Sequence, residues 1–163
     1  MKMDKKTKIK MVKEHIEEFV TLKELERNNF TSAVPMSNTK KFDILAIDNM
    51  NSDNQIAIQV KTTTKRKLKY IKWMLNKKSE YMIGNNIFYV FVVFDGKNSL
   101  DKPDYYIVSS EVVAQSIKQR HIQFLSTSKR NGEPHKDIDM REFIVLIGED
   151  EYKNKWNILR KER

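Results

Sequence analysis

The sequence contains no cysteine, only four glycines and three prolines, and no long hydrophobic run. Without cysteine the chain cannot form disulfides, use a thiol as a nucleophile or bind zinc through thiolates. So few glycines and prolines leave little room for a linker, and we expect one domain over residues 1–163. The longest apolar run, Ile87–Phe94, is far shorter than the roughly 20 residues that span a bilayer. The basic start Met1–Met11 leads into charged residues rather than an apolar signal-peptide core, so we expect a cytoplasmic protein with no membrane contact.

The charge of the chain is strongly positive. It has 31 Lys and Arg residues against 22 Asp and Glu residues, a formal net charge of +9 and a pI near 9.6. A hydrophobic content of 39% is sufficient for a core at this length. The excess of basic residues therefore favours a polyanionic partner, above all nucleic acid.

Apolar patterning predicts an alternation of helices and strands. Helices are expected over 5–28 and 110–120, with a polar loop over 126–136 and a mostly helical stretch over 140–159. Strands are expected over 32–36, 42–48, 54–62, 87–94 and 105–108.

The strand over 54–62 carries two large polar side chains, Gln59 and Lys61, in an otherwise apolar pattern. Successive side chains in a strand alternate between faces, so these two share one face while the aliphatic residues at 56, 58 and 60 share the other. Asp43 opens the preceding strand, and the Asn-, Asp- and Ser-rich stretch between the strands predicts a hairpin. The pattern therefore predicts that a carboxylate, an amide and an amine converge.

The order Asp43, then Gln59-x-Lys61, resembles the active-site motif of the PD-(D/E)XK nuclease superfamily. The helix that ends before Asn29-Phe30 is similar to the leading helix of the Holliday-junction-resolvase-like branch, in which a glutamate precedes a Gly-aromatic pair by about three turns. That spacing assigns the glutamate to Glu18. The resemblance covers roughly the whole chain, with two departures: Phe42 replaces a proline, and Gln59 replaces the commoner glutamate.

The resemblance implies an α/β fold with a restriction-endonuclease-like core of order αβββαβ, a central mixed β-sheet flanked by helices. It implies a DNA endonuclease that uses Mg²⁺ or Mn²⁺, with Asp43, Gln59 and Glu18 as metal ligands and Lys61 orienting the nucleophile or stabilising phosphate charge. Because Gln59 is neutral, metal affinity is expected to be lower than with glutamate. Double-stranded or branched DNA is the implied substrate, and a homodimer is compatible with it.

A basic segment follows the motif. Lys65, Arg66, Lys67, Lys69 and Lys72 are candidate DNA-binding residues, because cations beside a phosphodiesterase site suit a phosphate backbone. Trp73 within this segment is expected to cover core rather than stack on a base. A second basic cluster around Lys129-Arg130 would extend the same track.

Each feature also has a structural explanation. Asp43 alone is compatible with a turn cap, and Gln59 and Lys61 alone are compatible with the exposed face of an edge strand. The three histidines are isolated and are expected to be structural or surface residues. Two functions other than catalysis therefore stay open: an inactive nucleic-acid-binding module, and an interaction subunit with the same fold.

Overall fold

The computed structural model describes residues 5–36, 41–65, 68–94, 103–148 and 151–160, with side chains from Ile16 onward in the first helix. The helical elements are α1 (Lys5–Arg27), α2 (Ser110–Leu125) and two short 3-10 helices, η1 (Lys77–Glu80) and η2 (Trp156–Leu159). The strands are β1 (Phe30–Ala33), β2 (Ile44–Asp48), β3 (Asn51–Thr64), β4 (Tyr70–Asn76), β5 (Ile87–Phe94), β6 (Asp104–Ser109) and β7 (Met140–Leu146).

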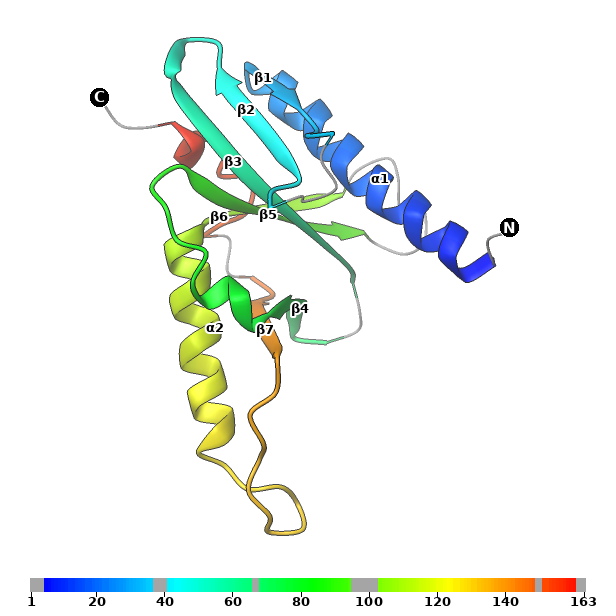
Figure 1. The fold of residues 1–163 in the computed structure, drawn as a ribbon, viewed down its shortest axis with the longest axis vertical. Helices are drawn as coiled ribbons and strands as arrows, with labels where there is room; N and C mark the ends of the chain where they lie inside the picture. Colours follow the sequence, from blue (N-terminus) through cyan, green and yellow to red (C-terminus); the bar gives the residue numbers. More distant parts are fainter. Residues whose placement is uncertain (1–4, 37–40, 66–67, 95–102, 149–150, 161–163) are drawn as a thin grey trace.

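Five strands form a central mixed sheet in the order β1-β2-β3-β5-β6 (Figure 1). β3 and β5 run parallel, and the other neighbouring pairs are antiparallel. The predicted α/β fold with a central mixed sheet flanked by helices is confirmed. β4 and β7 form a separate antiparallel two-stranded sheet.

The two faces of β3 belong to two different cores. Ile58 and Val60 pack with Val20 and Leu25 of α1 on one face. The opposite face, that of Tyr89 and Phe91 on β5, is covered by α2 and the β4–β7 sheet. α1 and the second sheet therefore lie on opposite sides of β3, and the residues of β3 alternate between them.

Trp73 is a core residue, as predicted. It is 1% exposed, and its ring lies 4.8 Å from the ring of Phe91 and 6.2 Å from that of Phe143 between centroids. Its Nε1 donates to the carbonyl oxygen of Val92 at 3.3 Å. The indole thus joins the small sheet to the large one.

The prediction of a mostly helical C-terminal stretch is wrong. Met140–Leu146 is a strand, because Phe143 and Val145 alternate with outward residues and pair with β4, and only Trp156–Leu159 forms a short helical turn. β1 also begins earlier than expected, at Phe30. α2 begins at Ser110, and the Ser109 hydroxyl caps it by accepting from the Val112 N–H.

The connection between the parallel strands β3 and β5 also differs from the expected order. An αβββαβ core predicts a helix after the third core strand, whereas here β4 and η1 occupy that position, and the long helix α2 follows β6 instead. This exchange brings β4 and η1 beside the polar face of β3.

Candidate functional site

Asp43 and Gln59 contact each other across the β2–β3 hairpin. The Asp43 N–H donates to the carbonyl of Ile58, the partner of Ile44 at the start of β2, at 2.9 Å and so ties Asp43 to β3. Asp43 Oδ2 in turn accepts from the Val60 N–H at 2.7 Å and from Gln59 Nε2. The strand register therefore brings together two residues that the sequence separates.

Lys61 shares the face of Gln59, because residues two apart in a strand project to the same side. In the parallel register Gln59 lies beside Tyr89 and Lys61 beside Phe91. Both polar side chains are partly buried and border one hollow of about 570 Å³. The carboxylate, the amide and the amine thus lie on a single face.

The hollow is closed on its other side by residues from β4, η1 and the start of β7, among them Asn76, Lys78, Ser79 and Asp139. The Asn76 side chain caps η1 by accepting from the Lys78 N–H at 3.0 Å. The Lys77 N–H donates to the Asp139 carbonyl at 2.7 Å and ties the two segments together. Sequence analysis did not find this wall, because the segment up to Lys78 was assigned only as a basic stretch and the stretch from Met140 was expected to be helical.

Glu18 belongs to α1, which covers the opposite face of β3. The contact of α1 with this end of the strand is made by its neighbour Glu17, whose carboxylate accepts from the Thr62 hydroxyl. The Asp43 carboxylate makes its hydrogen bonds with Gln59 and the Val60 N–H. The role of Glu18 as a metal ligand stays a prediction.

Tyr89 lies next to Gln59 under the site and was not identified from the sequence. Its phenol oxygen is buried and has no hydrogen-bond partner among the described residues. Burial raises the pKa of this phenol, the nearby Ser79 hydroxyl partly offsets the rise, and the Asp43 carboxylate adds to it. The phenol therefore stays neutral at physiological pH.

The residues implied as ligands offer the type of donor atom that a divalent cation prefers, but they carry little negative charge. Asp43 offers a carboxylate and Gln59 an amide oxygen, both of the hard type that Mg²⁺ prefers. Together they carry one formal negative charge, and the described residues contain no group of three or more Asp, Glu, His or Cys able to hold a metal. A metal at these residues would therefore be bound weakly.

The predicted DNA-binding residues are only partly described. Lys65 and Lys69 flank the β3–β4 connection and are exposed, whereas Arg66 and Lys67 lie outside the described residues. Lys72 on β4 pairs with Glu142 on β7 at 2.6 Å, so part of its charge is offset.

Among the described residues, no helix is long and apolar enough to cross a membrane.

Comparison with known proteins gives a structural match only. No protein-family model matches this chain, and neither does any curated protein. Its fold is similar to that of a bacterial homing endonuclease, I-Ssp6803I, with 12% sequence identity and a TM-score of 0.50 over 91% of this chain and 90% of that chain. The likeness is one of fold. It supports a nuclease-like architecture but does not by itself identify the PD-(D/E)XK superfamily.

Proposed function

We propose that this protein is a metal-dependent endonuclease that hydrolyses phosphodiester bonds of DNA at Asp43, Gln59 and Lys61. The observation that carries the proposal is the contact between Asp43 and Gln59 on the face of Lys61, at the edge of an open hollow. The fold of a homing endonuclease and the net charge of +9 support the same function.

In this proposal Asp43 and Gln59 hold a divalent cation, Mg²⁺ or Mn²⁺. When bound, the cation supplies Lewis-acid polarisation of the phosphate and lowers the pKa of an attacking water. The Gln59 amide, which now donates to Asp43, has to turn its oxygen toward the cation. Glu18 is the proposed source of additional negative charge.

Lys61 lies where its amine can stabilise negative charge on a bound phosphate. Its amine borders the same hollow as Gln59, so a phosphate seated there would receive a positive charge from one side. A fixed cation aimed at developing negative charge is among the strongest contributions that a side chain makes to phosphoryl chemistry. The lysine would also orient the nucleophile by hydrogen bonding.

One observation favours a second function, a DNA-binding module without catalysis. The Gln59 amide donates a hydrogen bond to Asp43. Because this position holds an amide and not a second carboxylate, the site carries little negative charge. Such a protein would bind DNA through its basic residues and leave it intact.

Incubation with supercoiled plasmid and with branched DNA, with Mg²⁺, Mn²⁺ or EDTA, separates the two functions. We expect metal-dependent nicking that is lost in Asp43→Ala. Cleavage that persists in EDTA would contradict the metal-dependent mechanism. DNA binding without cleavage at any metal concentration would establish the binding module instead.

A further inference from the structure

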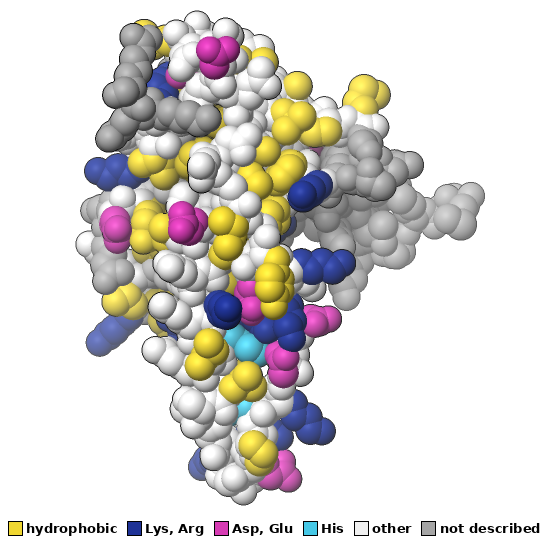
Figure 2. Space-filling model, turned by 60° about the vertical axis from the view of Figure 1, so that its left-hand side comes forward, with side chains coloured by type: hydrophobic (Ala, Val, Ile, Leu, Met, Phe, Trp, Pro, Cys, Tyr) yellow, Lys and Arg dark blue, Asp and Glu magenta, His cyan; other side chains and the backbone are white. Residues whose placement is uncertain are grey.

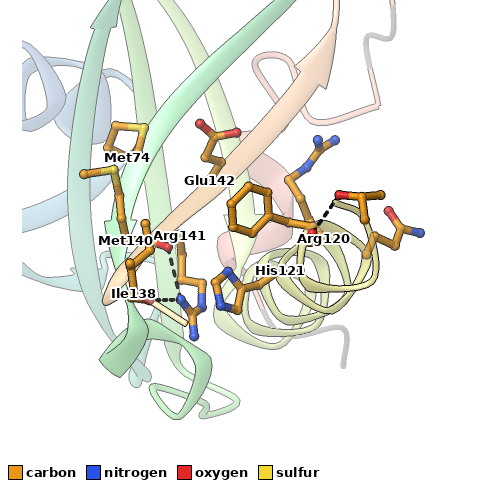
Figure 3. Close-up of a pocket in the computed structure, with 10 residues that line it drawn as sticks. Met74, Arg120, His121, Ile138, Met140, Arg141 and Glu142 are labelled. Carbon is orange, nitrogen blue, oxygen red and sulfur yellow. Dashed lines mark hydrogen bonds between the residues drawn. The ribbon is translucent and has the colours of Figure 1, made fainter. Parts of the chain in front are cut away.

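A second hollow adjoins the one at the candidate site. It has a volume of about 420 Å³ and lies between α2 and the β4–β7 sheet. Met74 and Met140 line both hollows, so the two hollows adjoin at these side chains, and together we call them the groove. Figure 3 shows Met74, Met140 and Glu142 on one side of the second hollow, with Arg120 and His121 of α2 on the other.

Most charges along the second hollow are already neutralised within the protein. Arg141 is buried and pairs with Glu80 and Asp137, and Glu142 pairs with Lys72. The walls left to meet a ligand are therefore largely apolar, including Met74, 43% exposed, Met140, 55% exposed, and Phe124, 39% exposed. An apolar surface of this kind suits the faces of bases rather than the sugar-phosphate exterior of a duplex.

Phe124 is held in place for such a contact. Its ring centroid lies 3.9 Å from that of His135 and 5.8 Å from that of His121, so the ring is supported from within the protein. The ring still borders the second hollow. In Figure 2 the histidine side chains lie among basic, acidic and apolar side chains in the lower half of the face in view.

Three cations are spaced along the groove. Lys61 and Lys78 border the first hollow and Arg120 the second. Within the described part of the chain, none of these three side chains has an ion pair, so their charges are available to phosphates. The groove thus combines cations with exposed apolar and aromatic side chains, the arrangement by which proteins bind single-stranded nucleic acid.

We propose that the groove binds an unpaired DNA strand that continues from the phosphate at the candidate site, with one base stacked on Phe124. This inference rests on the proposed function, since it places the strand beside Asp43, Gln59 and Lys61. It names the substrate class as DNA with an unpaired segment next to the cleaved bond, such as a gap, flap or branch. Lys61, Lys78 and Arg120 neutralise its phosphates, and the two methionines contact its bases through their thioethers.

The test is equilibrium binding in EDTA, measured by fluorescence anisotropy, so that it does not depend on cleavage. The probes are one duplex and the same duplex with a short unpaired gap. Wild-type protein is expected to bind the gapped DNA at least about tenfold more tightly than the continuous duplex, from stacking of one base or more. Equal affinity for the two probes would overturn the proposal.

Phe124→Ala should weaken binding of the gapped DNA by roughly fivefold to 100-fold, the range for loss of one base–aromatic stack, and leave duplex binding unchanged. Phe124→Trp should retain the preference for the gap. Phe19→Ala is the matched control, because Phe19 is 68% exposed on α1 and lines neither hollow. Thermal unfolding of each variant verifies the fold. Unchanged gap binding in Phe124→Ala, or an equal loss in Phe19→Ala, would refute the stacking site.

The two proposals fail separately. Metal-dependent, Asp43-dependent cleavage with no preference for the gapped probe would refute the groove and leave the nuclease intact. A preference for the gapped probe that depends on Phe124, in a protein that cleaves nothing, would support the groove and refute the nuclease. Quenching of 2-aminopurine in the gap by wild type but not by Phe124→Ala would show directly that the base stacks.

Discussion

Gln59 is the residue on which the chemistry depends most. As an amide it can donate to Asp43, and in the structure it does so. A glutamate at this position could not donate in its ionised form, and two carboxylates so close together would repel each other until a cation separated them. The amide therefore stabilises the metal-free site and lowers the affinity of the site for a metal ion.

Gln59→Glu should therefore tighten metal binding. A second anionic ligand raises the formal charge of the site to −2, and affinity for hard cations rises with ligand charge, here by about tenfold or more. Isothermal titration with Mn²⁺, without DNA, measures the effect, and Asn76→Asp on the opposite wall of the hollow is the control for added charge. Equal affinities of wild type and Gln59→Glu would show that residue 59 does not touch the metal.

Lys61→Ala should lower the cleavage rate by roughly 100-fold to 1,000-fold with little change in stability, because Lys61 acts on phosphate charge rather than on packing. The measurement is single-turnover cleavage at saturating Mg²⁺. Lys78→Ala, which removes an exposed amine at the same hollow, should lower the rate less. A rate in Lys61→Ala within twofold of wild type would remove Lys61 from the mechanism.

Glu17 and Glu18 are expected to behave differently although they are adjacent. Glu17 accepts from Thr62, so Glu17→Ala should lower the free energy of unfolding by about 1.5–3 kcal/mol, the range for a hydrogen bond to a charged group. Glu18→Ala should lower metal affinity and cleavage, and these two quantities rather than the melting temperature test its role. Calorimetry together with metal titration tests both variants. A Glu18→Ala protein with wild-type metal affinity would exclude Glu18 from the site.

At the scale of elements, Asp137 joins three segments that border the groove. It pairs with Lys77 of η1 at 2.6 Å, with His121 of α2 at 2.8 Å and with Arg141 of β7 at 3.3 Å. Hydrogen bonds from Lys77 and then from His121 hold the pKa of this carboxyl well below its ordinary value of 3.8. One ionised carboxylate therefore links these three segments.

The lowered pKa predicts the pH dependence of stability. A carboxyl with a depressed folded-state pKa contributes stability above its unfolded-state pKa and loses that contribution as pH falls further. Asp137→Asn should therefore be less stable than wild type at pH 7, and the difference should shrink below about pH 4. Thermal unfolding of both proteins from pH 3 to pH 7 measures it. A difference that stays constant over this range would contradict the assignment.

At the scale of the whole molecule, the excess of positive charge predicts salt-sensitive DNA binding. Each duplex phosphate neutralised adds about 0.9 to the slope of log affinity against log salt. If Lys65 and Lys69 each contact one phosphate, replacing both with alanine reduces the slope magnitude by about 1.8, and including Arg66 and Lys67 brings the reduction to ~3 to 4.

The control for this experiment is Lys23→Ala with Lys155→Ala, which removes the same charge at exposed positions on α1 and before η2. Binding isotherms over a range of salt concentrations for wild type and both double variants give the slopes. Equal slopes in the two variants would show that the net charge of +9, rather than a track along the β3–β4 connection, accounts for binding.

The local pattern determined which residues share a face of β3. The alternation of the strand and the turn-rich hairpin depend on nearest neighbours, and both predicted that Asp43, Gln59 and Lys61 converge. Trp73 was likewise predicted to cover core rather than to stack on a base, although it lies in a basic segment. The same kind of reasoning failed for Met140–Leu146, because a short apolar run has no strong period of its own and becomes a strand here by pairing with β4.

Only the tertiary structure decided what surrounds those three residues. That Glu17 meets Thr62 of β3 depends on the rotation of α1 against the sheet, which residue spacing alone does not determine. The groove joins β3, η1, α2 and β7, which are distant in sequence: η1 lies in the crossover between β3 and β5, whereas α2 and β7 follow β6. Local periodicity encodes the faces of single elements, whereas a site built between elements depends on how those faces pack.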